Sequence, residues 1–139
     1  MGCRNLPSLS AIALVTALAA SPIGCGGTDG GYYVPYGRLT LSWTINGTTD
    51  PEQCSQGSAA TFFVRIVYAD GTVMGDYAAQ CDAFATTIDL EAADYSGQAL
   101  LEDSAQNPST TSIDIAPFTI FDGGEFVIPL DFPASSFLQ

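Results

Sequence analysis

The sequence predicts an all-β protein, an antiparallel β-sandwich of about seven strands with one disulfide and a cleaved N-terminal signal helix. Three observations predict this fold: short segments of alternating apolar residues recur between turn residues, two cysteines bracket a predicted hairpin, and an apolar stretch follows Arg4. The expected organisation is a cleaved signal peptide in residues 1–24, a Gly- and Tyr-rich tether in residues 25–37, and the sandwich in residues 38–139.

The N-terminal segment has the layout of a bacterial signal peptide, and its apolar run in residues 6–20 is short for a membrane-spanning helix. It ends in Pro22-Ile23-Gly24-Cys25, which resembles the lipobox of bacterial lipoproteins, although Pro22 stands where Leu is usual. There a small residue precedes a cysteine that becomes the lipidated N-terminus. The alternative, ordinary cleavage after Ala19, leaves Cys25 as an exposed thiol in an oxidising compartment. Lipidation of Cys25 is therefore the favoured interpretation.

The first strand of the sandwich is predicted in residues 38–46, where Leu39, Leu41, Trp43 and Ile45 alternate with polar residues. After it, Asp50-Pro51 favours a short helical turn in the loop that carries Cys54.

The central element is a hairpin whose arms, residues 60–69 and 72–81, flank Asp70-Gly71. This dipeptide favours a two-residue primed turn, which fixes the register of the two strands. The register places uncharged residues together on one face. It also places Arg65 opposite Asp76, so we expect a cross-strand ion pair there. The first arm is apolar on both faces apart from Arg65, which indicates a central position in a sheet.

The same hairpin brings Cys54 close to Cys81, because Ala60 lies opposite Cys81 in the expected register. Of the other two cysteines, Cys3 leaves with the signal peptide and Cys25 takes the lipid, so these two remain to pair. A zinc site would need further Cys or His ligands. We therefore expect a disulfide between Cys54 and Cys81, which contributes about 3–4 kcal/mol to stability.

The rest of the chain supplies four more predicted strands. They are residues 84–90, 95–103, 110–115 and 125–132. A helix over residues 91–102 is disfavoured, because Ser96-Gly97 interrupts it and its apolar residues lack helical spacing. In the last strand Phe126, Ile128, Leu130 and Phe132 share one face, and Pro129 indicates a sheet edge. The resulting sandwich is immunoglobulin-like or transthyretin-like.

Composition excludes several classes of function. The expected mature chain, residues 25–139, keeps 15 acids and two arginines, a formal net charge of 2 − 15 = −13, which repels nucleic acid. The protein has no His, and its three cations are all Arg, so Ser-His-Asp, Cys-His, Schiff-base and zinc hydrolase sites are excluded. The adjacent pair Glu102-Asp103 would point to opposite faces of a strand. We expect no enzyme activity, cofactor, metal centre or nucleic-acid partner.

Calcium is the strongest chemical alternative, because it takes carboxylate and carbonyl oxygens from loops. Asp122 and Glu125 flank a Gly-Gly turn, and Asp103 lies near Asn107 in another loop. The spacing fits no EF-hand loop, however. Solvated turns are the expected role of these acids.

The chain resembles small, uncharacterised Gram-negative lipoproteins with a single β-sandwich domain, a type abundant in myxobacteria. The resemblance is carried by Cys25-Gly26-Gly27, Leu41-Ser42-Trp43, the pair Cys54 and Cys81, and Ile128-Pro129-Leu130-Asp131-Phe132. The chain also resembles, more loosely, transthyretin-like modules of carboxypeptidase-regulatory type, through Leu90 and Tyr95. In those modules a Gly is expected before the Tyr, whereas this chain has Ala93-Asp94. Neither resemblance implies an activity.

The expected function is that of an exported, lipid-anchored module at the outer membrane or cell surface, with a structural or interaction role. Its partners would be the membrane, through the lipid on Cys25, and an envelope protein or polymer. Tyr32, Tyr33 and Tyr36 are expected to pack on the domain, with a place at the membrane interface or on a binding surface as alternatives. The alternative function is a small-ligand or calcium-binding periplasmic or surface lipoprotein.

Overall fold

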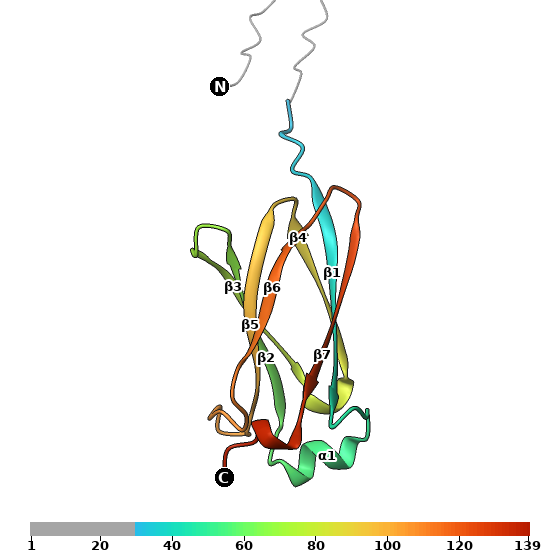
Figure 1. The fold of residues 1–139 in the computed structure, drawn as a ribbon. Helices are drawn as coiled ribbons and strands as arrows, with labels where there is room; N and C mark the ends of the chain where they lie inside the picture. The colour runs from blue at the N-terminus through green and yellow to red at the C-terminus, as the bar shows by residue number, and fades with distance from the viewer. Residues whose placement is uncertain (1–29) are drawn as a thin grey trace, which may run out of the picture. The chain divides into compact units, whose positions relative to one another are not determined.

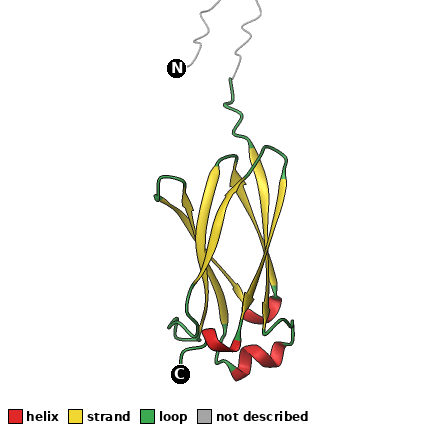
Figure 2. Cartoon of the chain, in the orientation of Figure 1, coloured by secondary structure: helices red, strands yellow, loops and turns green. Residues whose placement is uncertain are grey.

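A computed structural model describes residues 30–139, which form two facing β-sheets of a sandwich (Figure 1). One sheet has the order β4-β1-β7 and consists of β1 (Tyr36–Ile45), β4 (Ala85–Glu91) and β7 (Glu125–Phe132). The other has the order β3-β2-β5-β6 and consists of β2 (Thr61–Tyr68), β3 (Val73–Gln80), β5 (Asp94–Glu102) and β6 (Ile113–Thr119). Three short helices, α1 (Pro51–Gln56), η1 (Cys81–Ala83) and η2 (Ala134–Ser136), lie together at one end (Figure 2).

The predicted β-sandwich with one disulfide is confirmed, and its strand order differs from that of an immunoglobulin sandwich. In an immunoglobulin sandwich the first two strands share a sheet. Here β1 and β2 belong to different sheets.

One pairing differs from the fully antiparallel sheet that the sequence predicted. β7 runs parallel to β1, with Leu41 beside Ile128 and Trp43 beside Leu130. The reason is the path of the chain: β6 and β7 belong to different sheets, and β7 starts at the end of the sandwich where β1 starts. Apolar alternation defines the buried face of each strand but contains no information about the direction of its neighbour.

The turn of the central hairpin has three residues, so the predicted two-residue primed turn is wrong. The Gly71 N–H donates to the Tyr68 carbonyl at 2.9 Å, and the Tyr68 N–H donates to the Thr72 carbonyl at 2.9 Å. Gly71 has φ +85°, the left-handed conformation that closes three-residue hairpin loops. Asp70 assists by accepting the Thr72 N–H at 2.8 Å.

A β-bulge compensates for the extra turn residue. The β2–β3 register shifts between Ile66 and Val67, which leaves Met74 without a partner on β2. Beyond the bulge the predicted register is present, with Arg65 opposite Asp76. One consequence is that Val73, which the predicted register places on the uncharged face of the hairpin, is 53% exposed.

The boundaries of β6 also differ from the prediction. The segment at residues 110–115 was expected to be a strand, but β6 begins at Ile113 and continues through Pro117. Thr110 is instead buried before the strand, where its Oγ1 accepts the Leu101 N–H at 3.0 Å. Pro117 is tolerated because β6 is an edge strand, where one side of the backbone needs no hydrogen bond.

The last strand, β7, is an edge strand as Pro129 indicated. It is less buried than predicted: Phe132 is fully buried, whereas Phe126 is 39% exposed. An edge strand receives cover from fewer neighbours, which accounts for the partial exposure of its apolar face. The start of β4 differs too, because Phe84 has φ +53° and precedes the strand.

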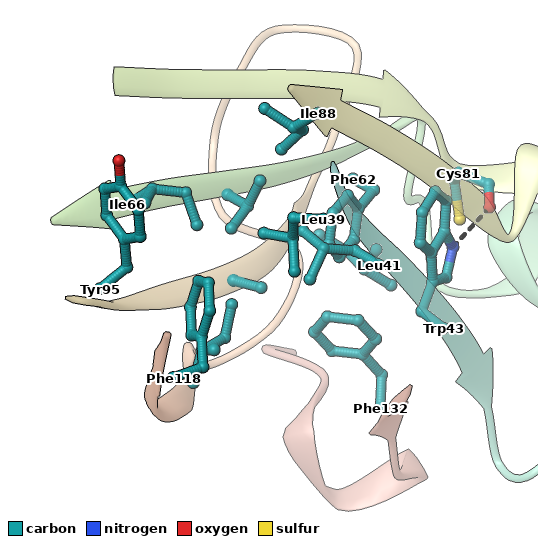
Figure 3. Close-up of a cluster of buried hydrophobic side chains, with 14 of the residues drawn as sticks. Leu39, Leu41, Trp43, Phe62, Ile66, Cys81, Ile88, Tyr95, Phe118 and Phe132 are labelled. Atoms are coloured by element: carbon teal, nitrogen blue, oxygen red, sulfur yellow. Dashed lines mark hydrogen bonds between the residues drawn. The ribbon is translucent and has the colours of Figure 1, made fainter. Parts of the chain in front are cut away.

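The core lies between the two sheets (Figure 3). The alternating residues predicted to face inward on β1 are at most 1% exposed, and those on β5 are equally well buried. The buried side chains of these strands and of β2 are Leu39, Leu41, Trp43, Ile45, Phe62, Val64, Ile66, Tyr95, Ala99 and Leu101. Burial of these side chains on both sheets holds the loops at the two ends of the sandwich in place.

Candidate functional site

The helical end of the sandwich is held by the predicted disulfide. Cys54 on α1 and Cys81 on η1 are bonded, with Cα atoms 6.0 Å apart and both residues buried. α1 forms because Asp50 caps it: the Asp50 Oδ1 accepts the Glu52 N–H at 3.0 Å. Trp43 connects this end to the core, since its Nε1–H donates to the Cys81 carbonyl at 2.8 Å (Figure 3). The disulfide is therefore an integral part of the folded structure.

The predicted ion pair between Arg65 and Asp76 is present on the outer face of the larger sheet. The Arg65 Nε–H donates to Asp76 Oδ1 at 2.7 Å, and its second guanidinium nitrogen donates to Oδ2 at 2.8 Å. The hydrogen bond from Arg65 lowers the pKa of Asp76 below its usual value. Both side chains are about half exposed, so the pair contributes more to register than to stability.

A groove of ≈ 340 Å³ lies beside this pair, between β2, β5 and β6. Gly97 forms part of its floor, and a Cβ at this position would lie 2.4 Å from the Arg65 carbonyl oxygen. The Gln98 side-chain amide crosses from β5 to β6 and donates to Asp114 Oδ1 at 2.9 Å. The sequence pattern does not predict this contact, because the long connection between β5 and β6 leaves their register open.

The tyrosines of the N-terminal segment, Tyr32, Tyr33 and Tyr36, lie at the opposite end of the sandwich, and two of them hydrogen-bond to the domain. The Tyr33 hydroxyl donates to Asp122 Oδ1 at 2.7 Å, which raises the pKa of Tyr33. The Tyr36 hydroxyl donates to Glu91 Oε1 at 3.2 Å, which raises the pKa of Tyr36. Tyr32 makes no such side-chain hydrogen bond to another described residue, and it is 98% exposed.

The acidic loops considered for calcium use their oxygens locally. Asp103 Oδ1 accepts the Ala105 N–H at 2.8 Å and the Asn107 N–H at 2.9 Å. The backbone hydrogen bond from Asn107 lowers the pKa of Asp103. Asp122 accepts from Tyr33. Within residues 30–139 no three His, Cys, Asp or Glu side chains lie close enough together to hold a metal ion.

The predicted lipidation site, Cys25, lies outside the described residues, as do the predicted signal peptide and the first part of the predicted tether. Within residues 30–139 no helix has the length and apolar character needed to cross a membrane.

Comparison with known proteins gives a distant likeness. No protein-family model and no curated protein sequence matches the chain. A leucine-rich repeat protein from Bacteroides thetaiotaomicron is similar in structure over 72% of this chain and 12% of its own, with a TM-score of 0.48 and 17% identity. The TIE protein of Bacillus anthracis is similar over 71% of this chain and 17% of its own, with a TM-score of 0.45 and 11% identity. The chain thus spans less than a fifth of either protein's length.

Proposed function

We propose that this protein is an exported, lipid-anchored module of the cell envelope whose sandwich acts by contact with another envelope protein or polymer. The observation that carries the proposal is the buried disulfide between Cys54 and Cys81. Disulfides persist in oxidising compartments, outside the cytosol. The bond also uses both cysteines of the described domain, which leaves Cys25 as the one remaining thiol of the expected mature chain.

The chemistry of the exposed residues supports a binding role over catalysis. Polar side chains on the outer face of the larger sheet pair with one another, as Arg65 does with Asp76 and Gln98 with Asp114. In these pairs the carboxylates are held by hydrogen bonds, and the lowered pKa of Asp76 makes it a weaker general base. The strongly acidic surface disfavours direct contact with anionic lipid, so the lipid on Cys25 is the expected link to the membrane.

The proposal is tested by radiolabelled palmitate incorporation and membrane fractionation in a Gram-negative host. We expect the wild-type protein to carry label and to sediment with membranes. A Cys25→Ser variant should lose both label and sedimentation, and the matched Cys3→Ser variant should keep both. Label or membrane association that survives in Cys25→Ser would contradict the proposal.

A further inference from the structure

The two sheets of the sandwich have four outer edges, formed by β3, β6, β4 and β7. Exposed edges pair readily with other strands, and proteins block them with bulges, prolines or charges. β3 is bulged at Met74, and β6 contains both a register shift and Pro117. The ladder from β4 to β1 is continuous over Ala85–Glu91, and that segment contains no proline. β4 therefore has the most regular outer edge of these three strands.

The β7 edge is blocked by Pro129. The Arg38 N–H donates to the Gly124 carbonyl, and the Asn46 N–H donates to the Phe132 carbonyl. These two bonds flank the parallel ladder. The backbone N–H and C=O groups of even-numbered β7 residues therefore bond to β1, and those of odd-numbered residues point away from β1, toward the open edge. Pro129 therefore lies at an outward-facing position, where it lacks the N–H that a new strand would need.

The hydrogen bonds of β4 show which of its groups are free. The Trp43 N–H donates to the Phe84 carbonyl at 3.0 Å, and the Ala92 N–H donates to the Pro35 carbonyl at 2.8 Å. In an antiparallel ladder, alternate residues of a strand bond to the same neighbour. The backbone N–H and C=O groups of even-numbered β4 residues therefore bond to β1, and those of odd-numbered residues point away from β1.

The outward-pointing backbone groups of three alternate β4 residues make no backbone hydrogen bond within residues 30–139. These residues are Ala85, Thr87 and Asp89. The next outward position, Glu91, differs because its carbonyl accepts the Tyr95 hydroxyl at 2.8 Å. The free ladder is therefore long enough to bind a short extended strand.

Charge indicates what kind of strand fits. Asp89 and Glu91 are exposed and two residues apart, so both carboxylates lie on the outer face of the sheet. Among residues 30–139, Arg38 pairs with Asp89 at 3.4 Å, and both side chains are exposed. A second copy of β4 would bring four carboxylates onto one face of a shared sheet, which is unfavourable. A strand with cations at alternate positions would neutralise them.

We propose that the outer edge of β4 binds an extended segment of a partner protein that carries Lys or Arg at alternate positions. The segment adds a strand to the smaller sheet, its backbone bonds to residues 85, 87 and 89, and its cations face Asp89 and Glu91. This inference rests on the proposed interaction role and names the class of partner.

The first test uses the detergent-solubilised full-length protein and two synthetic peptides, one alternating Lys with Val and one alternating Glu with Val. Amide hydrogen exchange is followed by NMR. The Lys peptide should protect the Thr87 and Asp89 amides, and added salt should weaken the effect. No protection of these amides, or equal protection by the Glu peptide, would overturn the proposal. Protection that rises with protein concentration in the absence of peptide would identify a second copy as the occupant and also overturn it.

The second test uses variants. Thr87→Pro removes an outward N–H and should weaken Lys-peptide binding at least about tenfold. Its matched control, Val127→Pro, places the same ring at the exposed outer edge of β7 and should leave binding unchanged. Protected β1 amides verify the fold of each variant. Equal weakening by both prolines would contradict a site on β4.

A charge-reversal variant, Asp89→Lys with Glu91→Lys, provides a test that introduces no proline. It should shift the preference from the Lys peptide to the Glu peptide, and an unchanged preference would contradict the assigned cation partners.

Peptide binding is measured independently of the lipid on Cys25. Failure of lipid labelling with intact peptide binding would therefore contradict only the anchoring, whereas failure of peptide binding in a labelled protein would contradict only the β4 site.

Discussion

The indole ring of Trp43 lies flat against the phenyl ring of Phe62, with ring centroids 4.0 Å apart and an interplanar angle of 2°. The two residues come from different sheets, so this stack joins the two layers of the sandwich. Trp43 also donates its Nε1–H to the Cys81 carbonyl. One side chain thus connects the inter-sheet contact to the disulfide-bonded end.

Replacing Phe62 by Ala should lower the free energy of unfolding by about 3–5 kcal/mol, because it removes a fully buried ring and leaves a cavity beside Trp43. Trp43 is the only tryptophan, so urea unfolding followed by its fluorescence reports the change directly. The control Phe121→Ala, at a side chain that is 69% exposed, should change stability by less than about 0.5 kcal/mol. Similar losses in both variants would argue against the stack as a major contact.

The double variant Cys54→Ala with Cys81→Ala should lose about 3–4 kcal/mol of stability, since the bond closes a loop with a sequence separation of 27. The loss should appear as a lower urea midpoint for the variant. Reduction of the wild-type protein should produce a comparable shift. An unchanged midpoint in the variant would show that the bond contributes little to the folded state.

Gly97→Ala should destabilise the protein by about 1–3 kcal/mol, because its Cβ would lie 2.4 Å from the backbone oxygen of Arg65 in the middle of the larger sheet. The neighbouring strand cannot move away without loss of its ladder. Gly30→Ala, where no atom lies within 4 Å of the added Cβ, is the matched control and should be neutral. Thermal unfolding of the two variants measures the difference, and a neutral Gly97→Ala would contradict the close approach of β2 and β5.

Stability should fall in strongly alkaline solution because of Tyr95. Burial raises the pKa of Tyr95 from 10.0 to about 12, and its hydroxyl donates to the Glu91 carbonyl at 2.8 Å. Because the folded pKa exceeds the unfolded one, the contribution is fully present below pH 10 and is lost as pH rises towards about 12.

Urea unfolding at a series of pH values between these limits measures the effect for wild type and Tyr95→Phe. The variant should show a shallower decline, since it has no proton to lose at this position. Identical slopes for the two proteins would contradict the assignment. Tyr33, Tyr36 and Tyr77, whose pKa values are also raised, contribute to the slope that remains in the variant.

Calcium should leave the melting temperature unchanged. Asp103 already accepts two backbone N–H groups in its own turn, and Asp122 accepts the Tyr33 hydroxyl. Calcium also needs several oxygen ligands, and within residues 30–139 no three His, Cys, Asp or Glu side chains lie close enough together to hold a metal ion. Differential scanning calorimetry with and without millimolar calcium is the measurement; a clear rise in melting temperature would favour the calcium-binding alternative.

The sequence predicted the inward faces of the strands well, because the alternation of residues such as Leu39, Leu41 and Trp43 follows directly from burial on one side. It also predicted that Arg65 faces Asp76, although for an incomplete reason. The turn is one residue longer than expected, and the bulge at Met74 restores the same register.

The direction and order of the strands could not be predicted from local pattern. The parallel pairing of β7 with β1 joins segments that are distant along the chain. The contact between Gln98 and Asp114 likewise depends on how β5 and β6 meet across a long connection. Such non-local features are determined by how the two sheets pack together. The free edge of β4 became visible only when its hydrogen-bond partners were known.

The intact mass of the native protein, purified from membranes without reduction, reports the lipid anchor and the disulfide in one spectrum. We expect a chain that begins at Cys25, carries lipid on that residue, and is two hydrogens lighter than its reduced form because Cys54 and Cys81 are bonded. An unmodified chain that begins at Ala20, or a native mass that does not change on reduction, would contradict it.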